Sequence, residues 1–181
     1  MSEVLVAAGK ATGMFYKAPK GTAAPETPGT TPGSAWVLAG DISEDGISLK
    51  LPSGDVLRNW ALVAKRKINT ENGVVSAPIM DTTKKVLETL FGEDNVSYTA
   101  ASSAHGNIST VELAPDVTAE SAAYLFLMKD GDTLVSLYSP DALITEIADV
   151  PLKGTEAAIW NASIAGTWTF SVDDGAVESE S

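Results

Sequence analysis

Short apolar runs separated by glycine, proline, asparagine and aspartate fill most of the chain after Trp36, and this pattern constrains the fold more than any other feature. In residues 47–51, apolar side chains alternate with Ser48 and Lys50, which is the period of two of a strand with one buried face. The chain is therefore predicted to be mostly β. Further runs lie at residues 36–39, 56–68, 74–80, 95–101, 107–113, 122–128, 134–138, 142–148, 157–164 and 166–172.

One stretch departs from this period. Apolar residues recur at helical spacing from Val86 to Phe91, the polar run that begins at Asp81 can cap a helix, and Gly92 can end it. These signals predict a helix near residues 82–91, with its apolar side against a sheet.

Residues 36–49 are predicted to form a hairpin. The apolar run that begins this stretch is followed by an acidic turn, in which Asp45 and Gly46 form a strong turn signal, and then by the alternating run described above. A third strand is predicted over residues 56–68, and it contains Trp60.

A second hairpin is predicted to join residues 122–128 to residues 134–138 through a turn rich in aspartate and glycine. The run at residues 122–128 is apolar at nearly every position, so this strand is expected to be buried on both faces. Pro140 and Pro151 are predicted to break the sheet on either side of the next strand, residues 142–148.

Three regions are expected along the chain. Residues 1–35 comprise an N-terminal strand and a Pro/Gly-rich arm, residues 36–172 form the β-domain, and residues 173–181 are an acidic disordered tail. Residues 1–17 can add a strand to a sheet edge of this chain or of a neighbour. Four prolines in residues 18–35 favour an extended arm, which is either a disordered linker or a segment that orders only against another subunit.

The formal charge of -12, from 12 Lys+Arg and 24 Asp+Glu, excludes nucleic-acid binding driven by phosphate attraction. The basic cluster, Lys65, Arg66 and Lys67, is too small to reverse this balance, and it is interpreted as a solvated strand end or as an ion-pair partner for acidic residues of a neighbouring subunit. There is no cysteine, hence no disulfide framework. No apolar stretch approaches the roughly 20 residues that span a bilayer, so a soluble protein is expected.

The candidate catalytic and metal-binding residues lack the required patterns. His105 is the only histidine, and Ser102 precedes it in the same loop, but no strand-turn-helix nucleophile motif surrounds them. Asp41, Glu44 and Asp45 offer oxygen ligands, but the calcium-loop spacing with its closing glutamate is missing. Neither an enzyme, nor a metal site, nor a cofactor site is expected.

Four tryptophans leave a second class of function open. A carbohydrate-binding or adhesive β-sandwich on a virion or cell surface could use them as a sugar-stacking platform. Each lies in a strand pattern, where burial in the core is the expected role. The residues concerned are Trp36, Trp60, Trp160 and Trp168.

The order and spacing of residues 36–47, Trp60, residues 80–82 and residues 86–92 resemble those of the major tail proteins (tail tube proteins) of long non-contractile-tailed bacteriophages, especially those that infect actinobacteria. The similarity in kind extends from the Pro/Gly-rich arm to the last strand. It implies a β-sandwich or barrel-like fold with one flanking helix and an extended N-terminal arm.

The resemblance also implies a function. Copies would close into hexameric rings in which strands from neighbours join an inner barrel around a channel, and the rings would stack through loops and the N-terminal arm. Such a tube assembles around a tape-measure protein and contacts tail terminator and distal tail proteins at its ends. Double-stranded DNA would pass through the tube without being bound specifically. No membrane partner is expected. The expected location is the virion tail, assembled in the bacterial host cytoplasm. Expected subunit-assembly residues are Trp36, Asp41, Glu44, Asp45, Gly46 and Trp60.

Overall fold

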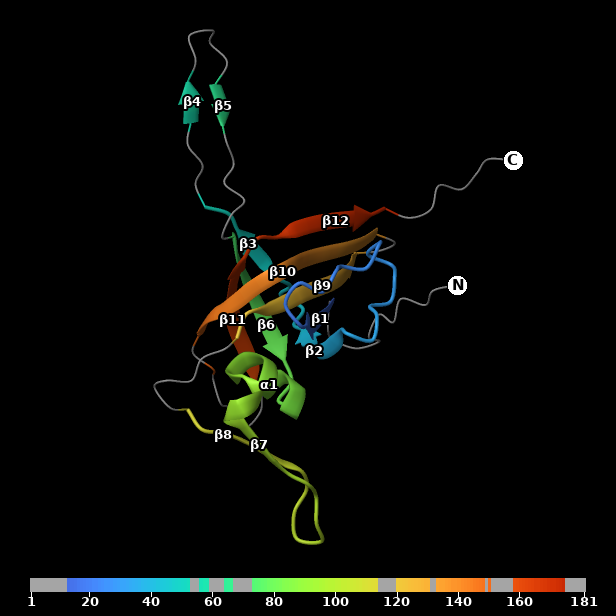
Figure 1. The fold of residues 1–181 in the computed structure, drawn as a ribbon, viewed down its shortest axis with the longest axis vertical. Coiled ribbons are helices and arrows are strands. Elements are labelled where there is room, and N and C mark those ends of the chain that lie inside the picture. Colours follow the sequence, from blue (N-terminus) through green and yellow to red (C-terminus); the bar gives the residue numbers. More distant parts are fainter. Residues whose placement is uncertain are drawn as a thin grey trace, which may run out of the picture.

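Six antiparallel strands close into a barrel, which forms the body of the protein (Figure 1). Pairing runs β1–β2–β6–β11–β10–β9 and returns to β1. The predicted mostly β, barrel-like fold is confirmed. The strands are β1 (Gly13–Ala18), β2 (Val37–Ile42), β6 (Gly73–Met80), β9 (Ala122–Asp130), β10 (Thr133–Ile147) and β11 (Ile159–Gly166). This computed structural model describes residues 13–52, 56–58, 64–66, 73–113, 120–130, 133–148, 150 and 158–174.

Two further strands continue barrel strands in the same direction. Strand β3 (Ser48–Lys50) follows β2 along β6, and β12 (Thr169–Asp173) follows β11 along β10. The predicted hairpin of residues 36–49 is therefore wrong, because β2 and β3 both pair antiparallel to β6 and not to each other. The turn signal itself is real: Gly46 has a positive φ of 68°, and its N–H donates to Ser43 O at 2.9 Å. The turn does not reverse the chain: β3 continues in the direction of β2, and both strands pair with β6.

Two two-stranded hairpins project from opposite ends of the long axis of the molecule (Figure 1). One pairs β4 (Val56–Arg58) with β5 (Ala64–Arg66), and the other pairs β7 (Val96–Thr99) with β8 (Ile108–Val111). The strands of the second hairpin were predicted as the runs at residues 95–101 and 107–113. The single strand predicted over residues 56–68 is wrong, since the structure has the β4–β5 hairpin there. The reversal was not predicted because this run contains no glycine or proline to mark it. Trp60 lies outside the described residues.

The single predicted helix is confirmed as α1 (Lys84–Phe91), followed by a 3-10 turn at η1 (Glu93–Asn95). Asp81 Oδ1 accepts the N–H groups of Thr82 and Thr83 at 2.6 and 3.1 Å, which fixes the chain just before the helix. Gly92 ends it with a φ of 87°. The buried residues Val86 and Leu90 join the barrel core.

The predicted β9–β10 hairpin is confirmed, but Pro140 does not break the sheet. Strand β10 runs through it with a register shift between Ser139 and Ala142 on the β9 side. A proline has no N–H to donate, and this irregularity removes the need for one. The expected burial of β9 on both faces is confirmed from Ala122 to Phe126.

Two apolar clusters lie on the two faces of β9. Inside the barrel, Phe15 stacks on Tyr124 and Phe126 with ring centroids 5.4 and 4.7 Å apart, and helix α1 adds to this cluster. On the outer face, Ala18, Trp36, Ala123 and Leu125 form a smaller cluster. Near β9 and β1, the barrel wall therefore carries apolar clusters on both its inner and its outer face.

Replacement of Gly166 by alanine is expected to destabilise the barrel. An added Cβ would lie 2.6 Å from Ala142 Cβ and 3.0 Å from Asp141 O, and this overpacking is expected to lower the free energy of unfolding by about 1–3 kcal/mol. Gly33→Ala is the control, because its Cβ meets nothing within 4 Å. Urea unfolding of both variants measures the difference, and equal midpoints would contradict the expected close approach of β10 and β11.

Candidate assembly surfaces

The Pro/Gly-rich segment folds back on the barrel of its own chain. The Gly21 N–H donates to Pro140 O at 2.8 Å, and the Tyr138 hydroxyl donates to Thr22 O at 2.7 Å. Burial raises the pKa of the Tyr138 hydroxyl above its ordinary value. The sequence left two alternatives for this segment, a disordered linker or an arm that orders only against another subunit. Neither describes it, because the segment is ordered by contacts within its own chain.

Lys20 adds an ion pair to the same contact. Its Nζ lies 2.7 Å from Asp141 Oδ2, and this hydrogen bond is the main reason that the pKa of the Asp141 carboxyl is lowered. Both side chains are largely exposed, so the pair adds little stability. The two hydrogen bonds to β10 carry more of the anchoring.

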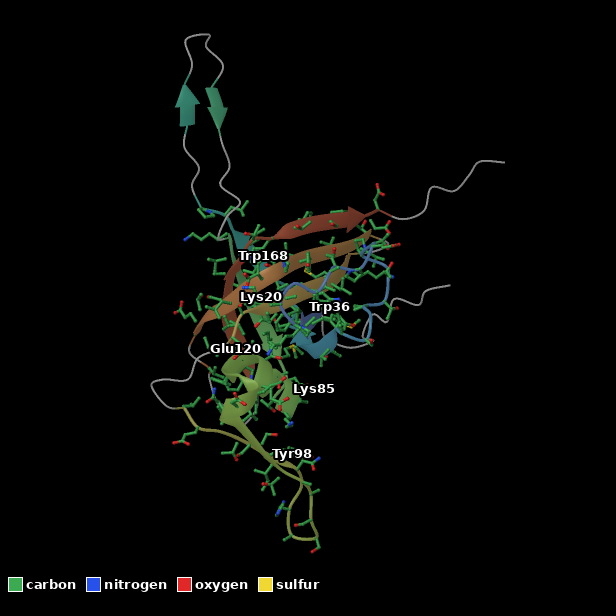
Figure 2. All side chains as sticks on the ribbon, in the orientation of Figure 1. Lys20, Trp36, Lys85, Tyr98, Glu120 and Trp168 are labelled. Atoms are coloured by element: carbon green, nitrogen blue, oxygen red, sulfur yellow. The ribbon has the colours of Figure 1, made fainter. Side chains whose placement is uncertain are left out.

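Trp36, at the C-terminal end of the Pro/Gly-rich segment, also holds this segment against the barrel. Its indole Nε1–H donates to Ala23 O at 3.2 Å, and its ring packs edge-on against Tyr138 with centroids 6.1 Å apart. Figure 2 shows Trp36 and Lys20 against the barrel, away from the two projecting hairpins. Trp36, one of the predicted assembly residues, is thus buried in its own chain.

The acidic turn between β2 and β3 presents carboxylates to solvent. Ser43 is buried and its N–H donates to Pro78 O at 3.0 Å, whereas Glu44 and Asp45 are exposed. Asp41 pairs with Met80 in the β2–β6 ladder. No group of three or more His, Asp or Glu side chains able to hold a metal ion occurs among the described residues.

The described tryptophans do not form an exposed platform. Trp168 is buried beside Phe126, and its Nε1–H donates to Gly73 O at 3.0 Å. Trp160 is half-buried and packs edge-on against Phe91, with centroids 5.6 Å apart. The expected burial of tryptophan in the core is confirmed for Trp36 and Trp168.

His105 lies at the exposed tip of the β7–β8 hairpin. Its Nδ1 is 2.7 Å from Gly106 O, and its own carbonyl accepts the Ser102 N–H at 2.8 Å. The Ser102 hydroxyl accepts the Ala104 N–H. The polar groups at this tip are therefore used to shape the turn.

Sequence reasoning located β3 and β12 as strands but did not identify them as edge strands. In the described part of the chain, β3 pairs only with β6 and β12 only with β10, so each leaves one backbone edge without a strand partner. Phe170 and Val172 on β12 are 61% and 52% exposed, and Leu49 on β3 is 38% exposed. Apolar alternation was visible in both runs, but alternation cannot tell an edge strand from a central one.

The apolar side chains of the two edges lie on the side of the sheet that faces the core. Phe170 is the cross-strand partner of Leu137, and Leu49 is the partner of Val75. Direct partners share a face of the sheet, and both Leu137 and Val75 are buried in the barrel cluster. In the part of the chain that the structure describes, the core-facing surface therefore extends past the barrel and is partly exposed at both edges.

Comparison with known proteins identifies the family. The sequence model of the family described as "Phage tail tube protein" matches residues 1–162. The chain belongs to that family. No curated protein matches this tail tube chain.

Family membership makes this tail tube chain a structural component of a phage virion tail that assembles with itself into a tube. The β-rich barrel with one helix agrees with that assignment. Within the described residues, no helix is long and apolar enough to cross a membrane.

The variant Tyr138→Phe is expected to loosen the arm of the tail tube chain. It removes the hydrogen bond to Thr22 O but keeps the ring that packs on Trp36, so the free energy of unfolding should fall by about 0.5–1.5 kcal/mol. Amide hydrogen exchange of residues 19–36 should also become faster. Asp141→Asn is the control: it removes the exposed ion pair with Lys20 and keeps an oxygen that can accept the Ser121 hydrogen bond. A larger loss in the control would contradict this division of roles.

Proposed function

We propose that this protein forms stacked, hexameric rings that build the phage tail tube, with the open edges of β3 and β12 as the joints within each ring. The observation that carries the proposal is that, among the described residues, β3 and β12 each have one edge without a strand partner, with apolar side chains on the core-facing side of the sheet. An open, apolar edge is a template for pairing with another chain.

In the proposed ring, β12 of one copy pairs with β3 of the next. The contact is head-to-tail, because the two edges are different, and a closed ring of such contacts leaves no edge open. Phe170 and Val172 would then be covered by the residues around Leu49. Six copies per ring is the number that the resemblance implies.

The acidic turn would lie next to this joint, because it directly precedes β3. Asp41, Glu44, Asp45 and Gly46 are thus proposed to line the contact between neighbours within a ring. Trp36 would support it indirectly through the arm, and a role for Trp60 remains a proposal from the sequence. The proposed organisation keeps residues 1–35 as strand and arm, 36–172 as the tube domain and 173–181 as an acidic tail.

The remaining parts of the proposal concern the channel. The tube is proposed to assemble around a tape-measure protein in the host cytoplasm, to meet terminator and distal tail proteins at its ends, and to have no enzymatic activity. With a formal charge of -12 per copy, an acidic channel would let double-stranded DNA slide without adhering.

Electron microscopy of the purified full-length protein tests the proposal. Rings of six copies and tubes built from them are expected at high protein concentration. A monomer at every concentration, also in the presence of the tape-measure protein, would overturn it.

Lysine at the exposed apolar positions of β12 should block ring formation. Phe170→Lys/Val172→Lys places two charges on the edge, a substitution that disfavours strand addition. Sedimentation should show monomers. Thermal unfolding should give a nearly unchanged melting temperature, because both side chains are more than half exposed. Leu143→Lys is the control, since Leu143 is 39% exposed and pairs with Ala165 in the β10–β11 ladder, not on the edge strands β3 and β12. Rings of normal yield from the double variant would rule out β12 as the joint.

A further inference from the structure

Two opposite sides of the barrel differ in the side chains that they present outward. In the closed order β1–β2–β6–β11–β10–β9, β11 is the strand farthest from β1, and β6 is the strand farthest from β9. The β6–β11 side therefore lies across the barrel from the β9–β1 side. Figure 1 shows β11 at the left of the barrel and the blue arm at its right.

The β9–β1 side is covered by the arm of its own chain. The outward apolar cluster on this side includes Ala123 and Leu125, and Trp36 packs on it. The hydrogen bonds of Gly21 and Tyr138 described above hold the arm in this place. We call this side the arm side.

One row of small polar side chains crosses the β6–β11 side. Each member is the direct partner of the next, on β3, β6, β11 and β10 in turn: Ser48, Ser76, Ser163 and Glu146. Direct partners share a face of the sheet. Because Val75 and Ile164, which adjoin two of the serines, are buried in the barrel cluster, this row points outward. Ser48, Ser76 and Glu146 are exposed.

The β6–β11 side offers few groups that bind nucleic acid. Among the residues of β3, β6, β11 and positions 142–147 of β10, Lys50 is the only cation and Glu146 the only carboxylate. The second outward row consists of Lys50, Val74, Ala165 and Leu143. Neither row contains an aromatic ring on which a base could stack, and a single cation per copy is a weak phosphate site. We call this side the serine side.

We infer that the serine side of each copy lines the channel of the tube and that the arm side faces outward. The channel wall then consists of serine rows with one carboxylate and one ammonium group per copy, along which double-stranded DNA slides. The net charge of -12 per copy adds a repulsive field for phosphates. This inference rests on the proposed function, because only an assembled tube has a channel.

The strand ladders favour the same orientation. Eight residue pairs join β6 to β11, so the serine side is a continuous sheet that a sliding polymer does not displace. The arm, by contrast, is an irregular segment held by a few hydrogen bonds and the exposed pair of Lys20 and Asp141. The serine row also reaches β3, which is one of the two strands of the proposed joint, so the row extends to the contact between copies.

Cysteine labelling of assembled tubes tests the orientation, because the full-length chain contains no cysteine of its own. Ser76→Cys places a thiol on the serine side, and Ala24→Cys is the matched control on the exposed part of the arm. The reagent is a maleimide coupled to albumin, which is too large to enter a channel the width of DNA. In tubes, Ser76→Cys should react about tenfold or more slowly than in the unassembled chain, since thiol reactivity follows access. Ala24→Cys should react at the same rate in both states.

Ser163→Cys repeats the measurement at a second position of the same row. Rapid labelling of Ser76→Cys or slow labelling of Ala24→Cys in tubes would overturn the inference. Failure of both serine variants to form tubes would also overturn it, because a side chain that lines the channel makes no contact between copies. All of these outcomes leave the proposed function standing, whereas an unchanged protein that forms no rings would refute the proposed function itself.

A charge change on the serine side should make the channel hold DNA. Glu146→Lys leaves two cations and no carboxylate per copy on this side, so tubes assembled with short double-stranded DNA should retain it in a form protected from nuclease. Glu26→Lys makes the same change in net charge on the exposed arm, and DNA bound there should stay open to digestion. Equal protection by the two variants, or none by Glu146→Lys, would contradict the place of Glu146 in the channel wall.

Discussion

Closure of the barrel by the β6–β11 ladder is the constraint on which the rest of the structure depends. Eight residue pairs join these strands, from Met80 with Ile159 to Gly73 with Gly166, although the two strands lie about half the chain apart. At the glycine end of the ladder, Trp168 covers Gly73 and donates a hydrogen bond to its carbonyl. Each strand then leads out of the barrel: β6 into α1, and β11 into β12. The positions of the helix and of one open edge follow from this single ladder.

Much of the fold could be predicted from local signals. Alternation and turn residues located most strands, and the helix was placed within two residues because capping, apolar spacing and a terminating glycine all agreed at residues 81–92. The errors share one cause, which is that strand partners are not encoded locally. The Asp45–Gly46 signal correctly marked a turn but could not say whether the chain would reverse or detour. Pro140 marked an irregularity that a bulge absorbs within β10.

The candidate assembly surfaces were harder to predict, for a related reason. Trp36 stood out in the sequence because it is large, but its size serves the inside of the chain, where it holds the arm against β9 and β10. The exposure of Phe170 and Leu49 could not be predicted, because an apolar residue in an alternating strand is normally buried. Only the closed topology reveals that their strands lie at edges. The basic run at Lys65 was easier to recognise from the sequence, because the chain as a whole is acidic.

The collinear arrangement of β11 and β12 has a mechanical consequence. If neighbours pull on β12 along its length, the load runs parallel to the strand and is shared by all five residue pairs of the β10–β12 ladder. A load across the strand would instead open these pairs one after another, as in a zipper. Because β12 is also the direct continuation of β11, the same load passes into the barrel wall without crossing a flexible loop. Tension applied along these strands therefore meets the barrel in shear, the direction in which a ladder of hydrogen bonds resists best.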